Sequence, residues 1–249
     1  MSSPPAVVTL CDMIEHARGA LLADQVGGGV QPTTPLGLLQ QAAQGDALHL
    51  WGDAELTAYA NEAVDEVATR TLCLTDRGTV VGITQFAMAA LGSPEVAIDT
   101  RILQVTRVTV NGQAIDPVSL RDLDWASRTW GDRTGQPRGF VMDDSGRSLR
   151  LVPAQSEACT LRLEVVRRPL TLMANSTDEP EIPLHMRRGA VQWMCHLAYL
   201  KNDSETSFPG GASGFSALFD QQFGPRRDAF SLLRGLQASM RGRARLHFF

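Results

Sequence analysis

The residues best suited to chemistry are two histidines and a cysteine in one apolar, helix-like stretch. His185 and His196 are eleven positions apart, and Cys195 directly precedes His196. A helix rises about 1.5 Å per residue and would hold the two histidines roughly 16 Å apart. Adjacent side chains on a helix point about 100° away from each other. A tetrahedral metal site needs its ligands in one coordination shell, so we expect no metal and no cofactor here.

Other stretches only partly match catalytic motifs. Residues 211–214 read Gly-Ala-Ser-Gly, which is one residue short of the nucleophile elbow that would expose Ser213. Asp143 and Asp144 could act as a carboxylate pair, but the residues around them are typical of a surface turn. The sequence therefore predicts no catalytic residues. A hydrolase would require Asp143, His185 and Ser213 to converge in the fold.

The C-terminal end of the chain carries an unusual charge distribution. Residues 229–249 contain no Asp or Glu and have a net charge of +4, whereas the whole 249-residue chain has −4, so the residues before them carry −8. An acidic body with a basic, aromatic end is typical of a subunit that docks its end into a neighbour. The candidate docking residues are Arg234, Arg241, Arg243, Arg245, Leu246, His247, Phe248 and Phe249.

Composition limits the class of protein. Hydrophobic residues make up 43% and charged residues 20% of the chain, which is ordinary for one large or two modest globular domains. We see no signal peptide and no apolar run of the roughly 18 residues that span a bilayer. The four cysteines have no CxxC spacing and are expected to be free, buried thiols. Lys201 is the only lysine; the arginine bias suits protein interfaces, although a GC-rich genome would produce it too.

Helical periodicity dominates the N-terminal third. Residues 9–23 form an amphipathic pattern that Thr9 would cap. A glycine-rich linker follows, and a short helix is expected over 35–44. The clearest helix is predicted over 53–73, with Asp53 as its cap.

Short β-like runs occupy residues 79–170. Residues 101–110 are rich in β-branched side chains, and Asn111-Gly112 is the strongest short signal for a hairpin. The return strand would then be 113–117. Further strands are expected over 148–152 and 160–166.

Helical periodicity returns over 183–200 and from about 212, until Gly224-Pro225 interrupts it. The predicted fold class is α+β: an antiparallel helical bundle with an inserted β-rich module and an extended C-terminal arm. The expected parts are bundle helices at 1–76, a β-rich module at 77–176, bundle helices at 177–240 and a docking arm at 241–249.

Two stretches of these helices resemble the head-to-tail adaptor proteins of tailed bacteriophages, including the podophage tail tubular protein A type. The first opens with Trp51-Gly52-Asp53-Ala54-Glu55-Leu56 and continues to Ala68. The second runs from Glu181-Ile182-Pro183 to Phe223 and is similar to the family's paired C-terminal helices with a short acidic loop. That family also carries a β-rich insertion between the two stretches. The resemblance covers about residues 50–240.

The resemblance implies a structural virion protein at the capsid–tail junction, made in the host cytoplasm, and no enzyme. Such adaptors form a ring, usually of twelve subunits, below the portal protein. The ring continues the DNA channel and attaches the tail (nozzle or tube) protein, and its C-terminal segments bind the portal. No membrane is involved. The alternative is a DNA-binding packaging-accessory protein whose basic tail contacts phosphates, although an acidic body disfavours a general duplex binder.

Overall fold

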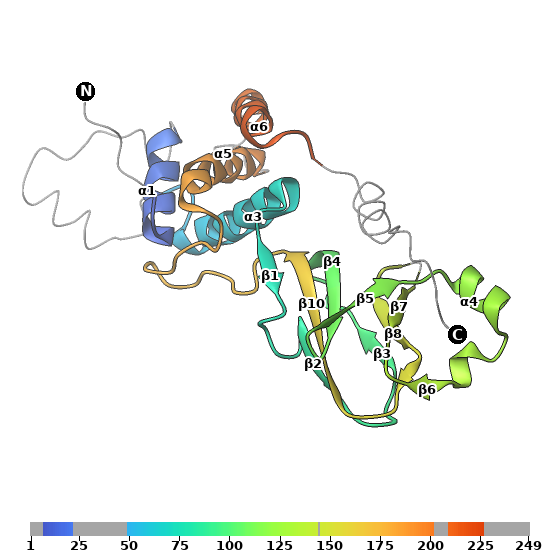
Figure 1. Cartoon of the computed structure of the whole chain (residues 1–249). Coiled ribbons are helices and arrows are strands. Elements are labelled where there is room, and N and C mark those ends of the chain that lie inside the picture. Colours follow the sequence, from blue (N-terminus) through green and yellow to red (C-terminus); the bar gives the residue numbers. More distant parts are fainter. Residues whose placement is uncertain (1–6, 22–48, 144, 202–208, 227–249) are drawn as a thin grey trace, which may run out of the picture. The chain divides into compact units, whose positions relative to one another are not determined.

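The computed structural model describes residues 7–21, 49–143, 145–201 and 209–226, which divide into two compact units (Figure 1). The helical unit comprises the described residues of 1–71 and 169–226, and the β unit comprises those of 72–168. The chain is therefore of mixed α+β class, as predicted. The expected helix at 35–44 and the expected C-terminal arm lie outside the described residues.

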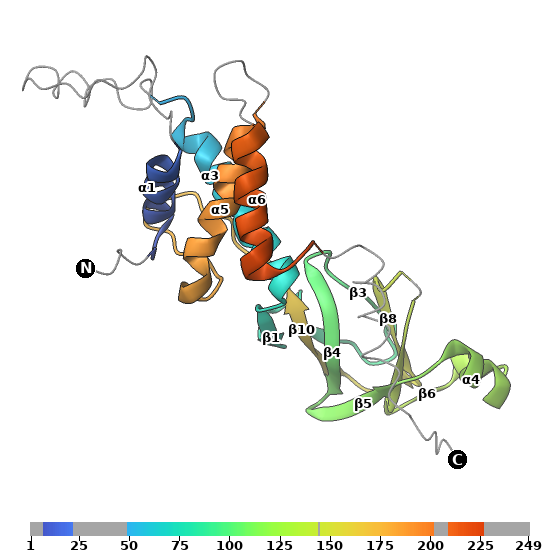
Figure 2. The same ribbon diagram turned by 90° about the horizontal axis from the view of Figure 1, so that it is seen from above.

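Four helices form the described part of the helical unit: α1 (Leu10–Ala20), α3 (Asp53–Thr71), α5 (Leu184–Leu200) and α6 (Pro209–Phe223). Helix α5 contacts α1, α3 and α6, and α1 and α6 each also contact α3 (Figure 2). With three neighbours, α5 buries side chains around much of its circumference. Its buried residues are Arg187, Gly189, Ala190, Val191, Trp193, Met194, Cys195, Ala198 and Tyr199.

The N-terminal ends of α1 and α3 differ in how they are capped. At α1, the Thr9 hydroxyl accepts the Asp12 N–H at 3.3 Å and the Asp12 carboxylate accepts the Thr9 N–H at 2.8 Å, so the predicted capping box is confirmed. The prediction that Asp53 caps the next helix was wrong. Asp53 is the first helical residue, and the Gly52 carbonyl accepts the first helical hydrogen bond. The Asp53 carboxylate instead pairs with Arg18 at 2.6 Å.

The other helix limits differ slightly from the predicted ones. Helix α3 ends at Thr71, two residues before the predicted end, because Leu72 adopts a left-handed φ of 55°. Helix α6 begins at Pro209, three residues earlier than expected, since proline suits a first helical turn. No helix of the described residues is long and apolar enough to cross a membrane.

Helices α5 and α6 approach each other closely at a glycine. A Cβ on Gly189 would lie 2.5 Å from the Gln222 side-chain oxygen and 2.6 Å from the Phe223 ring. Nearby, the fully buried ring of Phe219 packs 4.9 Å from the ring of Trp193. A side chain at 189 would therefore push α6 away from this aromatic contact.

Arg70 is the central polar residue of the helical unit. Its side chain is 3% exposed, and its guanidinium lies 5.0 Å from the Trp193 ring centre and 4.7 Å from that of Phe219. Nε donates to Glu66 at 2.8 Å, while Nη1 donates to the Asp220 carboxylate and, at 2.6 Å, to the Gly224 carbonyl. One buried cation therefore joins α3 to α5 and to the end of α6, and its charge is compensated by two carboxylates and two aromatic faces.

The β unit contains ten short strands. Their bounds are β1 (Thr75–Arg77), β2 (Gln85–Met88), β3 (Glu95–Ala97), β4 (Ile102–Val110), β5 (Gln113–Pro117), β6 (Thr134–Gly135), β7 (Gly139–Met142), β8 (Ser148–Val152), β9 (Ala154–Gln155) and β10 (Cys159–Arg167). The main sheet is curled and has the order β1-β10-β4-β5-β7-β8-β3, with β2 also paired to β10. Every pair in it is antiparallel except β5 with β7. Strands β6 and β9 form a separate parallel pair.

The predicted hairpin and both later strands are confirmed. Strands β4 and β5 pair with Val108 opposite Ile115, and the turn has φ of 49° at Asn111 and 80° at Gly112. Two successive positive φ angles define the turn type that Asn-Gly favours. Strand β10 spans 159–167 and alternates as expected, with Leu161 and Leu163 fully buried.

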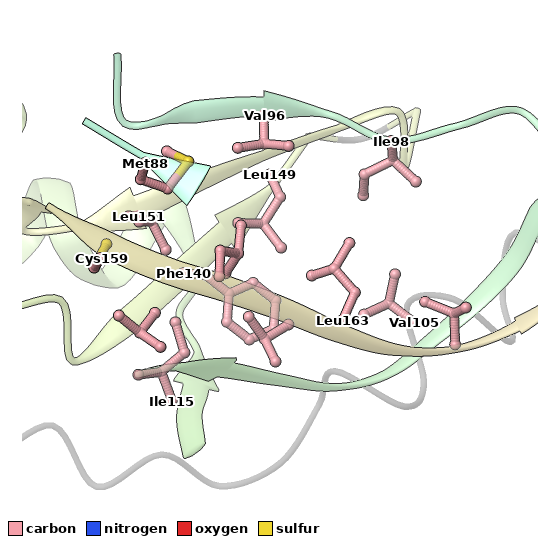
Figure 3. Packing of buried hydrophobic residues seen from close by; sticks show 14 of the residues in the cluster. Met88, Val96, Ile98, Val105, Ile115, Phe140, Leu149, Leu151, Cys159 and Leu163 are labelled. Carbon is pink, nitrogen blue, oxygen red and sulfur yellow. The ribbon is translucent and has the colours of Figure 1, made fainter. Parts of the chain in front are cut away.

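The sheet curls around an apolar core of its own, to which seven of its eight strands contribute (Figure 3). Figure 3 shows Phe140 and Leu163 pointing into the space between β7, β8 and β10, with Val96 and Ile98 covering it from the β3 segment. The core needs no residue from the helical unit. All four cysteines are free as predicted, and Cys159 lies in this core, but Cys11 is exposed and Cys73 is only half-buried, contrary to the prediction.

The connection between β5 and β7 was not predicted. Because parallel neighbours cannot be joined by a tight hairpin, the chain must cross over between them. It does so through helix α4 (Leu120–Ala126) and the 3-10 helix η2 (Trp130–Asp132). A second small apolar cluster holds this crossover to the sheet; its residues are Val118, Leu123, Val141 and Val152, with Trp130 against them.

Replacing Arg70 by Met should lower the free energy of unfolding by about 3 kcal/mol, because it leaves the nearly buried carboxylate of Glu66 without its main partner. Chemical denaturation of the full chain measures the change. The double variant Arg70→Met, Glu66→Gln should recover at least half of the loss. A single variant that costs less than about 1 kcal/mol would contradict the central role of this cation.

Candidate interaction surfaces

The eight predicted docking residues, Arg234, Arg241, Arg243, Arg245, Leu246, His247, Phe248 and Phe249, lie outside the described residues. The structure does describe the segment that leads to them. Gly224, with φ of 81°, ends α6, and its carbonyl is held by Arg70. Arg226, the last described residue, pairs with Glu66 at 3.4 Å. Arg70, Glu66, Asp220 and Arg226 are here called the Arg70 cluster. This cluster fixes the residues that precede the C-terminal segment to the helical unit.

The residues considered for catalysis or metal binding make local contacts. His196 Nδ1 lies 2.8 Å from the Ala212 carbonyl, and the Ser213 hydroxyl donates to the Gly210 carbonyl at 3.0 Å. Burial raises the pKa of the Cys195 thiol to about 12. His185 is exposed. In the described part of the chain, no three His, Cys, Asp or Glu side chains are placed to share a metal.

Asp143 has a structural part in the turn between β7 and β8. Its carboxylate accepts the N–H groups of Arg147 at 2.7 Å and Ser148 at 2.9 Å. Burial alone would raise its pKa, but these bonds and one from Ser145 outweigh burial, so the pKa is lowered. This is the turn that the sequence indicated.

The first surface that could serve interaction is a loop at residues 170–178, here called the clamped loop. Asn61 on α3 makes a two-point contact with Met173: it accepts the Met173 N–H at 2.8 Å and donates to its carbonyl at 2.9 Å. The Glu181 carboxylate accepts the N–H groups of Leu170 and Thr171 at 2.7 and 3.0 Å. An irregular segment is thus held by side chains where a sheet or helix would use backbone bonds.

The far end of the clamped loop closes on itself and on α1. The Asp178 carboxylate accepts the N–H groups of Ala174 and Asn175, each at 2.8 Å, and these two bonds lower its pKa. The carbonyls of Ser176 and Asp178 accept the first N–H groups of α1, from Cys11 and Leu10. The loop therefore supplies part of the cap of α1 and has a fixed shape.

The clamped loop presents one apolar side chain to solvent. Leu172 is 78% exposed, although its neighbour Met173 is buried. Acidic residues follow it, and the side chain of Glu179 is 60% exposed. The described residues of the helical unit are acidic as a whole: they contain 11 Asp and Glu against 6 Arg and Lys, a net −5. A fixed, exposed leucine in an acidic setting is suited to contact with another protein.

The second surface is a pocket of about 300 Å³ beside α4 in the β unit, here called the α4 pocket. Its lining residues are Leu123, Ala126, Ser127, Trp130, Arg133, Thr134, Gly135, Gln136, Arg138, Val152 and Pro153. Helix α4 lies near β6 in both views (Figures 1 and 2). The lining combines apolar side chains with two exposed arginines, Arg133 and Arg138, and no carboxylate.

The two tryptophans of the crossover have opposite environments. Trp130 lines the α4 pocket, donates from its indole N–H to Asp124 at 2.8 Å, and packs under the guanidinium of Arg150, 4.8 Å from its ring centre. Trp125 on α4 is 92% exposed. Tryptophan is among the residues most enriched where binding energy is concentrated, so an almost fully exposed tryptophan next to a pocket is a candidate binding residue.

Sequence reasoning missed both surfaces. The clamped loop depends on Asn61 and Met173, which are 112 positions apart, and no local pattern reveals that contact. A signal for the α4 surface does exist in the sequence. Trp125 and Trp130 stand among Asp and Arg in residues 120–138, outside any apolar periodicity, and such isolated tryptophans could have been noted as interface candidates.

Asn61→Ala should raise the hydrogen-exchange rate across residues 170–175 about thirtyfold, because the loop loses two side-chain bonds that each contribute about 1 kcal/mol. Exchange followed by mass spectrometry measures this. Glu62→Ala, an exposed change on the same helix, is the matched control and should leave these rates unchanged. Equal exchange in both variants would show that Asn61 does not hold the loop.

Trp125→Ala should change the free energy of unfolding by no more than about 0.5 kcal/mol because the side chain is exposed. Trp130→Ala should cost about 2 kcal/mol, since it removes packing against Leu123 and the stacking on Arg150. Denaturation of both variants provides the comparison. If Trp125→Ala is the more destabilising change, the side chain has a structural role and not a binding one.

Comparison with known families identifies one match. A model of the family described as SU10 adaptor protein matches residues 34–244, more than four fifths of the chain, and includes the described part of both units except α1. No curated protein matches the chain.

Proposed function

This chain belongs to the SU10 adaptor protein family, and from that premise we propose that it is a structural head-to-tail adaptor of a tailed bacteriophage, of the podophage tail tubular protein A type. In this proposal it forms a ring of twelve subunits below the portal protein, continues the channel through which DNA is packaged and ejected, and provides the attachment site for the tail nozzle or tube. It acts in the virion, at the capsid–tail junction. The family match over residues 34–244 is the observation that carries the proposal.

The division of charge supports this function. The described residues of the helical unit carry a net −5, and residues 227–249 carry five arginines and one aspartate, a net +4. In the proposed ring, the helices pack as a bundle around the channel. An acidic channel wall disfavours contacts with phosphates, so DNA passes without being held.

The C-terminal segment is the proposed portal-binding element. Its residues Arg234, Arg241, Arg243 and Arg245 would meet carboxylates of the portal, and Leu246, His247, Phe248 and Phe249 would enter an apolar groove. The Arg70 cluster supports this role, because it fixes the end of α6 from which the segment continues. A binding segment that starts at a fixed point loses less freedom on docking.

Deleting residues 241–249 should abolish binding to portal rings of the same phage while the thermal unfolding temperature stays unchanged. Pull-down on immobilised portal rings measures binding. Within the segment, Phe248→Ala with Phe249→Ala should weaken binding more than any single arginine substitution, because exposed ion pairs contribute only about 0–1 kcal/mol. Undiminished portal binding by the truncated protein would refute the role given to these residues.

The DNA-binding alternative makes a different prediction. A packaging-accessory protein that held phosphates through its basic tail would bind duplex DNA with an affinity that falls steeply with salt, with a slope near one per neutralised phosphate. We expect a gel-shift titration at two salt concentrations to show no specific complex, and deletion of 241–249 to make no difference. Strong, salt-sensitive binding that the deletion removes would favour the alternative over the adaptor.

A further inference from the structure

We propose that the α4 pocket of one copy receives the clamped loop of the next copy, with Leu172 inserted into the pocket, and that this is a subunit contact of the ring. The inference rests on the proposed function, because it assigns the contact by which the ring would be built. Neither surface has been assigned a role by the family match.

The α4 pocket is suited to an apolar side chain bordered by acidic groups. A volume of about 300 Å³ is many times the roughly 10–15 Å³ that a single water needs, so a leucine side chain fits against the apolar part of the lining. The lining contains Arg133 and Arg138 and no Asp or Glu. The two arginines favour an acidic partner group, while the apolar lining residues favour an apolar side chain.

The clamped loop has the complementary properties. Leu172 is 78% exposed on a loop whose shape is set by Asn61, Glu181 and Asp178. Such an arrangement keeps a large apolar side chain in water in a defined position, which reduces the entropy lost on binding. The Glu179 carboxylate follows the leucine in the chain; it is 60% exposed, pairs with Arg187 of its own copy at 3.1 Å, and would approach the two pocket arginines from its exposed side.

The two units also differ in net charge, in the direction that this contact requires. The described residues of the helical unit contain 11 Asp and Glu against 6 Arg and Lys, a net −5, whereas those of the β unit contain 10 Asp and Glu against 12 Arg, a net +2. Net charge makes a contact between a helical unit and a β unit of different copies more favourable than a contact between two helical units. Electrostatics therefore favours contacts in which the β unit of one copy meets the helical unit of another.

The loop and the pocket are different surfaces of the same chain, so their contact between copies is heterologous. Each copy then offers one loop and one pocket to its neighbours. Contacts of this kind close into a ring when the rotation between copies fits. Trp125, exposed at 92% next to the pocket residue Ala126, would lie at the edge of the contact.

The test is cysteine cross-linking in a Cys11→Ser background, which removes the exposed native thiol. One chain carries both Leu172→Cys and Gln136→Cys, the latter at an exposed position of the pocket lining. It is assembled on portal rings and treated with a short bis-maleimide. The control chain carries Leu172→Cys with Val81→Cys, a site in the β unit that is 79% exposed and outside the pocket.

The expected result is a ladder of covalent oligomers on a denaturing gel for the first chain and monomer for the control. Cross-linked monomer without a ladder would overturn the inference, because the contact would then lie within one copy. Rings that assemble on the portal but give no cross-link at 136 would also overturn it while leaving the adaptor function intact. If the wild-type chain forms no ring on the portal, the proposed function fails and this inference fails with it.

A charge variant gives a second, independent measurement. Arg133→Glu with Arg138→Glu should reduce the yield of portal-bound rings at least tenfold, since like charges would face the acidic loop. Arg121→Glu with Arg128→Glu makes the same change in net charge at exposed positions of the same crossover that do not line the pocket. Equal ring yields for the two variants would contradict the specific role of the pocket.

Discussion

The helical unit depends on how one buried cation is compensated. Arg70 lies among three helices, and a guanidinium removed from water is stable only where carboxylates, carbonyls and aromatic faces replace its hydration. Glu66 supplies one carboxylate from the same helix, and Asp220 supplies the other from α6. The geometry of this cluster sets where α6 lies against α3 and where the chain continues past Arg226. This structural cation bears on the proposed function because Gly224, whose carbonyl it holds, precedes the proposed portal-binding segment in the chain.

Polar side chains that bond to backbone groups hold the irregular segments of both units. Asn61 binds the backbone of Met173, Asp76 accepts four hydrogen bonds around the turn after β1, and the buried Gln155 donates to three carbonyls of the segment before β3. Each of these side chains replaces bonds that a helix or sheet would have provided. Loops held in this way keep their shape when exposed, which is what a subunit needs if its contacts are formed by loops.

Local patterns in the sequence predicted elements that depend on local interactions. Thr9 and Asp12 indicated a capping box, Asn111-Gly112 indicated a hairpin, and the periodicity of 183–200 indicated α5 to within one residue. Strands β1 and β3, each three residues long, are too short to show a period, and the parallel pairing of β5 with β7 depends on residues more than twenty positions apart. The crossover between them was missed for that reason.

Candidate interaction residues were likewise predicted only where composition or a local pattern indicated them. Charge composition alone drew attention to residues 229–249, because net charge can be counted without knowing the fold. The α4 pocket could not be found in this way: Leu123 and Val152 meet only after the sheet has formed, and neither differs in sequence from an ordinary core residue. The clamped loop was equally hidden, since Leu172 is an interaction candidate only once Met173 beside it is known to be buried. Composition was enough to indicate the charged C-terminal segment, whereas the α4 pocket and the clamped loop could be identified only from the fold.

The most direct test of the adaptor function is the mass of the native complex formed when the purified chain is mixed with portal rings. The portal mass should rise by twelve copies of the 27.0 kDa subunit, and no smaller stable stoichiometry should accumulate. A portal mass that stays unchanged in the presence of excess protein would contradict it.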